Sequence, residues 1–215
     1  MKLTNVWLKL TMVFALTLLA NNQAIAQERW QDHTIFEQNK EAPRASFFSY
    51  ENELLAIKNN AEESENYLSL NGLWRFNWVK KPALAPMGFE VTNFDDSSWT
   101  HIKVPGNWET QGFGHAIYLD ERYPFATKWP DAPTDYNQVG SYRRDFNIPK
   151  NWQKKSVFLH IGGARSALTV FVNGKEVGYS QGAKTPAEFN ISRYLKPGKN
   201  TLAMQIIRWS DASYL

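Results

Sequence analysis

The side chains best suited to chemistry in this sequence are two carboxylates in aromatic surroundings. Asp211 follows an Arg-Trp-Ser triplet close to the end of the chain, and Asp120 lies in the aromatic-rich segment 117–125. A carboxylate can accept hydrogen bonds from two sugar hydroxyls, or coordinate a hard cation through oxygen. Judged by residue type alone, each is more often a solvated loop acid. A sugar-binding role and an ordinary surface role therefore both stay open.

The adjacent pair Asp95 and Asp96 is a second candidate for acid–base chemistry. Glycoside hydrolysis uses two carboxylates about 5–5.5 Å apart for retention, or about 6.5–9.5 Å apart for inversion. Neighbours in an extended chain point to opposite faces, so these two cannot flank one glycosidic bond. Because Ser97 and Ser98 follow, the pair is predicted to form or cap a turn.

The histidines, serines and cysteines give no pattern typical of a metal or nucleophile site. The four histidines lack a metal-ligand spacing, and no serine lies in a nucleophile-elbow motif. His160 falls inside a strand-like run and is predicted to be a structural histidine with a partner. The absence of cysteine excludes disulfides and thiolate metal ligands.

Nine tryptophans among 215 residues form the most unusual feature of the composition. The C–H faces of sugar rings pack on aromatic rings, so exposed tryptophans would fit carbohydrate binding. Large aromatic residues more often fill a core, where they dominate the buried area. We expect this core role for Trp74, Trp78, Trp99 and Trp108, so the composition supports carbohydrate binding only weakly.

Short apolar runs cut by turn residues must position these side chains. The predicted strands cover residues 67–70, 73–79, 141–148, 156–161, 167–172, 175–180 and 201–209. Asn71-Gly72 and Asn173-Gly174 are predicted hairpin turns, because Asn-Gly tolerates positive φ angles. Residues 196–199, Lys-Pro-Gly-Lys, predict a further turn. The pattern predicts an all-β, antiparallel sandwich, with residues 103–135 as a long irregular segment of functional or interfacial character.

The first part of the chain has a different organisation. Residues 1–26 are typical of a secretory signal peptide, with Lys2 and Lys9, a short apolar stretch and a small-x-small end at Ala24-Ile25-Ala26. The apolar stretch is too short to span a bilayer, which takes roughly 20 residues. We expect export to the periplasm or the medium, an irregular N-terminal arm over residues 27–66 with a short helix near 51–58, and the sandwich domain over 67–215.

The charge excludes two classes of partner. The formal net charge of +3 falls to +1 without the two lysines of the signal segment. No cluster of lysine and arginine follows that could match a phosphate backbone. The sequence therefore predicts neither nucleic-acid nor membrane binding.

A set of motifs in a fixed order resembles the N-terminal part of bacterial β-galactosidases of glycoside hydrolase family 2. The matching blocks cover nearly the whole chain after the signal segment. They include Trp30-Gln31-Asp32, Ser69-Leu70-Asn71-Gly72-Leu73-Trp74-Arg75-Phe76, Val104-Pro105-Gly106-Asn107-Trp108-Glu109, Gly140-Ser141-Tyr142-Arg143-Arg144, Phe171-Val172-Asn173-Gly174-Lys175 and Arg208-Trp209-Ser210-Asp211. No single block is specific, whereas their joint order is.

The resemblance implies a jelly-roll (galactose-binding-like) sandwich that precedes further domains, among them a catalytic barrel. A barrel takes about 250 residues, more than this chain has, so no catalytic residue is assigned here. By resemblance, Asp211 is a galactose-hydroxyl and sodium ligand. Asp120 stands where the family usually has a sugar-binding asparagine, and a carboxylate cannot donate the amide's hydrogen bond. Magnesium and sodium are the implied cofactors, with most ligands outside this chain.

The leading hypothesis is an N-terminal fragment of an exported β-galactosidase that cleaves terminal β-D-galactose residues with retention. Its partners would be a β-galactoside substrate, the C-terminal domains of the same enzyme and, in an oligomer, further copies of the chain. The last strand of the sandwich is expected beyond Leu215. The alternative is a stand-alone, non-catalytic carbohydrate-binding module.

Overall fold

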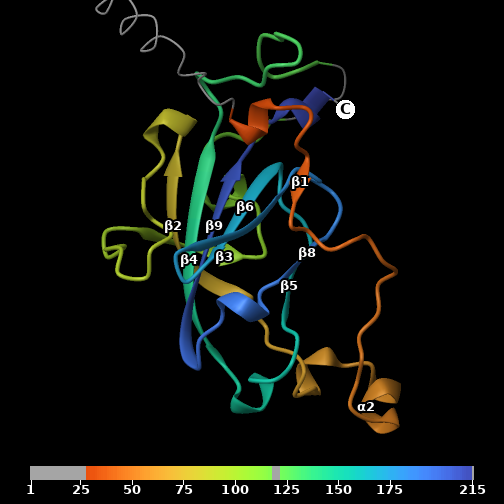
Figure 1. Cartoon of the computed structure of the whole chain (residues 1–215). Helices are drawn as coiled ribbons and strands as arrows, with labels where there is room; N and C mark the ends of the chain where they lie inside the picture. The colour runs from red at the N-terminus through yellow and green to blue at the C-terminus, as the bar shows by residue number, and fades with distance from the viewer. Residues whose placement is uncertain (1–27, 118–121, 215) are drawn as a thin grey trace, which may run out of the picture.

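The structure, a computed structural model, describes residues 28–117 and 122–214, and it is built from antiparallel β-strands (Figure 1). The signal segment 1–26 and Asp120 lie outside the described residues. The strands are β1 Glu37–Gln38, β2 Gly72–Val79, β3 Thr100–Val104, β4 Val139–Ile148, β5 Phe158–Ile161, β6 Ala167–Val172, β7 Lys175–Ser180, β8 Ala187–Asn190 and β9 Gly198–Ile207. The predicted all-β fold, a jelly-roll sandwich with an N-terminal arm, is confirmed.

Seven strands form the large sheet, in the order β1-β7-β6-β9-β4-β2-β3, and β5 and β8 form a small one. The long strands β4 and β9 pair along their whole length at the centre, from Val139 opposite Ile207 to Ile148 opposite Gly198. Their alternating side chains divide the residues between two faces of the sheet. The two faces consequently carry different structures.

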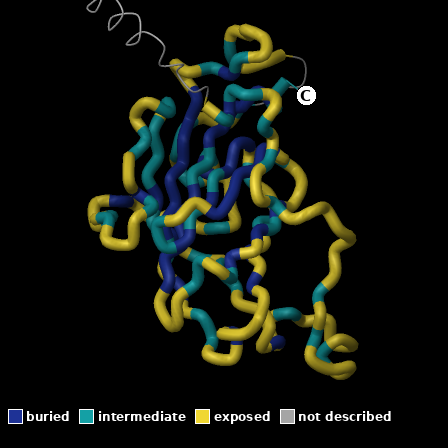
Figure 2. Tube along the Cα trace, viewed as in Figure 1, coloured by how far each residue is buried: buried dark blue, intermediate teal, exposed yellow. Residues whose placement is uncertain are grey.

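The main core lies between one face of the large sheet and the small sheet. Phe76, Tyr142 and Met204 from the large sheet belong to the same buried cluster as Leu159 and Phe189 from β5 and β8. Figure 2 shows this buried interior running along β4, β9 and β6, with exposed chain around it. Burial of such side chains, worth about 1.5–3 kcal/mol each, supplies the main stabilisation of the sandwich.

Two smaller apolar clusters lie on the other face of the large sheet. The first joins Val139, Ala167 and Ile207 to Trp30 and Trp209. The second packs residues 89–99 on Ala203 and Phe171. Between the two clusters this face carries the polar side chains of Asn77, Ser141 and Gln205, which lie side by side on β2, β4 and β9.

The predicted turn at residues 173–174 is confirmed. Asn173 has φ 52° and Gly174 has φ 81°, and β6 and β7 pair on either side of them. Both residues therefore adopt the left-handed conformation that a two-residue hairpin requires. The strand boundaries, 167–172 and 175–180, are those predicted from the sequence.

The predicted hairpin at Asn71-Gly72 is wrong. Residues 67–70 form no strand, and both edges of β2 pair elsewhere, with β3 and β4. The main-chain oxygen of Leu70 instead accepts hydrogen bonds from Trp74 Nε1 and Arg144 Nη1, both at 2.8 Å. Strands distant in sequence pair with β2 in place of the predicted local partner. The strands predicted from the sequence include neither β3 nor β8.

The N-terminal arm is more regular than predicted. It contains the 3-10 helix η1 Arg29–Gln31, strand β1, the helix α2 Glu53–Lys58 and the 3-10 helix η2 Ala61–Glu63. In Figure 1 the arm descends along the β1 edge of the large sheet to α2 at the far end. Asn52 caps α2 by accepting a hydrogen bond from Leu55 N, and Asn59 ends it at φ 50°.

Beyond the end of β3, the described residues 105–117 and 122–135 are largely irregular, as predicted. The short 3-10 helix η4 Glu109–Gln111 and an isolated bridge between Lys128 and Asp131 are the elements described there. The other 3-10 helices are η3 Pro82–Leu84, η5 Lys150–Trp152, η6 Ser192–Tyr194 and η7 Asp211–Tyr214. Among the described residues, every helix is too short or too polar to cross a bilayer.

Candidate functional site

The segment after β9 is held in place by two side chains that lie just before the neighbouring strands β4 and β6. Asn137 binds the main chain of Trp209 twice, donating from Nδ2 to the carbonyl oxygen and accepting from the N–H, each at 2.8 Å. Ser166 donates to the main-chain oxygen of Arg208 at 3.1 Å, and its Oγ lies 3.0 Å from Ser210 Oγ. These bonds fix where the chain enters η7, and therefore fix Asp211, its first residue.

Asp211 is buried, with only 6% of its surface exposed. It is therefore not a solvated loop acid. Its Oδ1 accepts a hydrogen bond from Gln181 Nε2 at 2.9 Å, and no ion pair of Asp211 occurs among the described residues. A buried carboxylate with a neutral partner is costly, because desolvation is not offset by an opposite charge.

Gln181 connects Asp211 to the N-terminal arm. Its Nε2 lies 2.8 Å from the Tyr179 hydroxyl, 3.2 Å from the main-chain oxygen of Arg29 and 3.3 Å from that of Ile35. Its Oε1 is buried and has no hydrogen-bond partner in the described part of the chain. A carboxylate and an unpaired amide oxygen thus belong to one buried cluster, which favours a donor or a cation as ligand.

Burial raises the pKa of the Asp211 carboxyl above its usual value of 3.8, and the hydrogen bond from Gln181 opposes this effect. Two charges of the arm act on the same group: His33 lowers the pKa and Asp32 raises it. The arm therefore contributes to the electrostatics of the candidate site as well as to its walls.

Five aromatic rings pack beside Asp211. Trp129 lies on Tyr214 with ring centroids 4.0 Å apart, and Phe125 lies 5.4 Å from Trp209. Tyr123 meets Phe125, Trp129 and Tyr214 at 5.1–5.7 Å. Trp129 is 60% exposed, so part of this cluster faces solvent. Exposed aromatic faces beside a carboxylate fit the apolar and polar sides of a sugar ring.

Two cations flank Trp209 on the same side of the fold. The guanidinium groups of Arg165 and Arg208 lie 5.2 Å and 5.0 Å from its ring centroid. Arg208 also forms an ion pair with Glu109, which accepts a 2.6 Å hydrogen bond from Trp108 Nε1. Glu109 is therefore engaged in a structural pair with Arg208.

The described residues do not build a complete metal centre. No group of three or more His, Cys, Asp and Glu that could hold a metal ion occurs in residues 28–117 and 122–214. The buried carboxylate of Asp211 fits one position in the oxygen shell of a hard cation such as sodium. Binding of sodium at Asp211 would therefore need further ligands from outside these residues, and so would binding of the magnesium that the resemblance implies.

The other predicted residues have structural roles. Asp95 accepts from Ser97 N at 3.0 Å, which confirms the turn, whereas Asp96 reaches Arg143 at 2.9 Å. His160 Nδ1 lies 2.9 Å from Glu188 Oε1, so it has the predicted partner, although at the surface. Three of the four predicted core tryptophans are buried, and Trp78 is half-buried against the core.

Sequence reasoning missed Gln181 and Asn137, the residues that hold Asp211 and Trp209. Both are fully buried polar side chains at strand ends. A long amide side chain directly after the apolar end of β7 was the available signal for Gln181. Nothing in the residues around Asn137 distinguishes it from an ordinary turn asparagine.

The arrangement is that of an antiparallel β-sandwich, and the comparisons with known proteins agree with this fold. A family model described as "Glycosyl hydrolases family 2, sugar binding domain" matches residues 67–215, so the chain belongs to this family.

Two relatives are β-galactosidases. That of Vibrio cholerae is 39% identical over 191 residues, which cover 89% of this chain and 18% of the relative. That of Psychromonas ingrahamii is 37% identical over 194 residues, 90% of this chain and 18% of the relative. The chain thus spans less than a fifth of the length of these relatives.

A solved structure of a Bacteroides uniformis β-glucuronidase is also similar. The TM-score is 0.49 at 28% identity, over 66% of this chain and 14% of that chain.

Proposed function

We propose that this chain is the N-terminal sugar-binding domain of an exported β-galactosidase that hydrolyses terminal β-D-galactosides with retention. The family match over residues 67–215 and the identity to β-galactosidases support the enzyme class. The observation that carries the role of this region is the burial of Asp211 with the neutral Gln181 as its hydrogen-bond donor and with no ion pair among the described residues. Such a group lowers its free energy when a ligand donates hydrogen bonds to it.

In this proposal Asp211 accepts hydrogen bonds from galactose hydroxyls, and Gln181 orients it. Because the carboxylate is desolvated before substrate arrives, its bonds to hydroxyls are stronger than they would be in water. The aromatic cluster around Trp209 packs against the ring and keeps water away. The catalytic carboxylates of the retaining mechanism belong to the remainder of the enzyme.

Asp211 also supplies one oxygen ligand to a sodium ion in this proposal. Sodium would neutralise the buried charge and present a positive centre to a sugar hydroxyl. Magnesium would be held by residues elsewhere in the enzyme. Asp120 would contact the sugar as an acceptor, in place of the asparagine usual in the family.

The test is Asp211→Asn in the full-length protein, with a chromogenic β-galactoside as substrate. Loss of an anionic contact to bound sugar should lower kcat/KM by about 10²-fold or more. Asp95→Asn is the matched control, since it also removes one carboxylate and keeps its turn bond, and its kinetics should equal the wild type. Replacing sodium by choline should raise KM in the wild type but not in Asp211→Asn.

Each part of the proposal has its own contradicting result. A wild-type protein that binds galactosides without cleaving them would reject the enzyme and favour a binding module. Active protein whose kinetics are unchanged by Asp211→Asn would reject the role of Asp211 alone. Recovery of the enzyme in the cytoplasmic fraction would reject export.

A further inference from the structure

A charged groove lies over β2, β3 and β4, on the face of the large sheet away from the main core. Its volume is about 370 Å³, enough for a group much larger than a water molecule. Its lining is almost entirely polar or charged. It comprises Leu73, Arg75, Asp96, His101, Arg143, Arg144, Asp145 and Thr201.

Basic side chains lie opposite one another across the strands at this groove. Arg75 of β2 is the direct partner of His101 in β3 and of Arg143 in β4. Like charges at directly opposed positions destabilise a sheet unless an anion lies between them. Asp96 supplies negative charge to this row through a short ion pair with Arg143 and a long one with Arg75.

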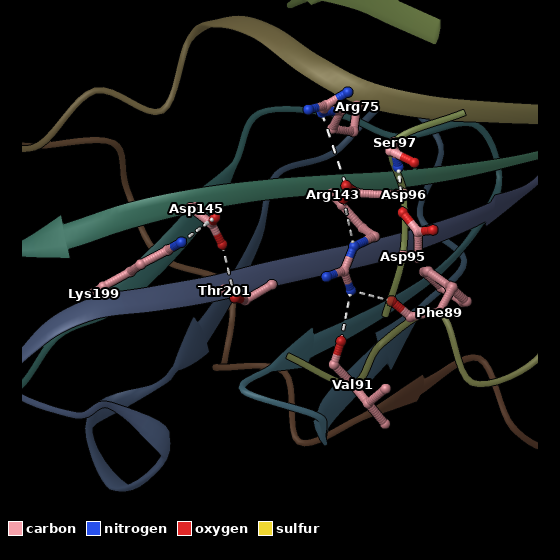
Figure 3. A network of polar contacts seen from close by, with 10 residues as sticks. All are labelled: Arg75, Phe89, Val91, Asp95, Asp96, Ser97, Arg143, Asp145, Lys199 and Thr201. Atoms are coloured by element: carbon pink, nitrogen blue, oxygen red, sulfur yellow. Dashed lines mark hydrogen bonds and ion pairs between the residues drawn. The ribbon is translucent and has the colours of Figure 1, made fainter. Parts of the chain in front are cut away.

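The carboxylates of the groove are already engaged. Asp96 bonds Arg143 Nε at 2.9 Å, and Asp145 bonds Lys199 Nζ at 2.9 Å and Thr201 Oγ1 at 2.8 Å. Figure 3 shows these contacts, together with the bonds from Arg143 to the main-chain oxygens of Phe89 and Val91. Arg143 is thereby fixed in place and buried.

Arg75 is held less tightly than Arg143 and Arg144, by a long ion pair with Asp96. Its nearest carboxylate oxygen, on Asp96, lies 3.9 Å away, beyond hydrogen-bond distance, and its side chain is 40% exposed. No hydrogen bond of the Arg75 guanidinium occurs within the described part of the chain. In Figure 3 this side chain reaches across from β2 towards Asp96, at the side of the groove opposite Phe89 and Val91.

We propose that this groove binds a small oxyanion group, a sulfate or a carboxylate, with Arg75 as its principal contact. A guanidinium presents a planar fork of N–H donors that matches two oxygens of such a group. Arg143 adds positive charge at the base of the groove, and His101 of β3 lines the same groove. The oxyanion comes either from a substituent on a saccharide or from a free ion.

The experiment is isothermal titration calorimetry of the full-length protein with sodium sulfate, in chloride buffer of constant ionic strength. The wild type should bind one sulfate saturably. Arg75→Gln should weaken binding about tenfold or more, since a charged hydrogen-bond donor pair is lost. Arg75→Lys should bind with intermediate affinity, because it keeps the charge without the fork.

Lys154→Gln is the matched control. Lys154 is exposed, has no partner among the described residues and lies beyond η5, so its loss removes the same charge without touching the groove. Its sulfate affinity should equal that of the wild type. Circular dichroism of Arg75→Gln verifies the fold.

Titrations with glucose 6-sulfate and with glucose distinguish the two sources of the oxyanion. Tighter binding of glucose 6-sulfate than of sulfate, lost in Arg75→Gln, identifies a saccharide substituent. Equal affinities identify a free ion, and both results support the site. Absence of saturable sulfate binding, as when an acidic side chain from another part of the enzyme fills the groove, overturns the proposal. Equal sulfate affinity of Arg75→Gln and the wild type does so too.

Discussion

Arg143 and Asp211 are both buried charged side chains next to the same large sheet, yet their surroundings differ. Arg143 has a carboxylate partner, Asp96, and donates to the main-chain oxygens of Phe89 and Val91. Asp211 has one neutral partner, Gln181. Burial of a charge is tolerated when its bonds are complete, and it is costly when they are not.

The difference separates a structural charge from the one that we propose binds a ligand. The bonds of Arg143 all go to residues 89–96, so they hold that segment on the sheet. Asp211 lacks such bonds, and the buried Oε1 of Gln181 beside it also lacks a partner among the described residues. Incomplete bonding inside a folded domain costs stability, and a ligand that completes it recovers this free energy.

The largest effect is expected from Arg143→Gln. The substitution leaves Asp96 and two main-chain oxygens without their cation. Removal of one partner from a buried ion pair lowers the free energy of unfolding by about 3–5 kcal/mol. Residues 89–99 should open, which hydrogen exchange followed by mass spectrometry detects as loss of protection at Phe94 and Trp99. Both N–H groups are hydrogen-bonded within this segment, to the oxygens of Val91 and Asp96.

Lys154→Gln again serves as control, and a surface change of this kind should stay within about 0.5 kcal/mol. Arg143→Lys should be intermediate, because an ammonium cannot reach all three oxygens in one plane. Unchanged protection of residues 89–99 in Arg143→Gln would show that the apolar contacts of Phe89 and Trp99 alone hold the segment.

The sequence predicted the sheet better than it predicted these two environments. The hairpin at Asn173-Gly174 depends on local backbone preferences, so its residues suffice. The failed hairpin at Asn71-Gly72 has the same dipeptide, but β2 pairs with strands more than 20 residues away. Pairing between distant strands depends on which side chains pack together in the core. A local sequence pattern does not predict this packing.

The candidate site shows the same limit. The Arg-Trp-Ser-Asp motif indicated Asp211 as a candidate sugar and sodium ligand, and that role stays a prediction. Its burial could not be predicted, because it arises from Gln181 and from the arm, 30 and more than 170 residues away in sequence. The row of Arg75, His101 and Arg143 was hidden for the same reason, since only strand register brings these residues together.

Asp211→Asn should change stability in the opposite direction to Arg143→Gln. The asparagine keeps an oxygen for Gln181 and removes the buried charge, so the protein without ligand should gain about 1 kcal/mol. Thermal melting in sodium-free buffer, without sugar, measures this. A loss of stability as large as that of Arg143→Gln would mean that Asp211 has a structural role as well.

The smallest effect concerns a half-buried charge that holds the arm. Glu188 of β8 accepts hydrogen bonds from Arg44 Nε at 2.9 Å and Nη2 at 2.7 Å, and from His160 at 2.9 Å. Burial raises the pKa of Glu188, but the bonds from His160 and Arg44 outweigh it and hold the pKa below 4.5. The arm should therefore be attached most firmly where Glu188 is ionised.

Because the folded pKa of Glu188 is depressed, its stabilisation is present above pH 4.5 and is lost as the pH falls through the folded value. Glu188→Gln should cost about 1 kcal/mol at pH 7, a roughly fivefold rise in the open arm, and nothing at pH 2. Hydrogen exchange of residues 40–50 measures the opening. The exposed Glu62→Gln is the control. If Glu188→Gln opened the arm equally at both pH values, the hydrogen bonds of this side chain, and not its charge, would hold the arm.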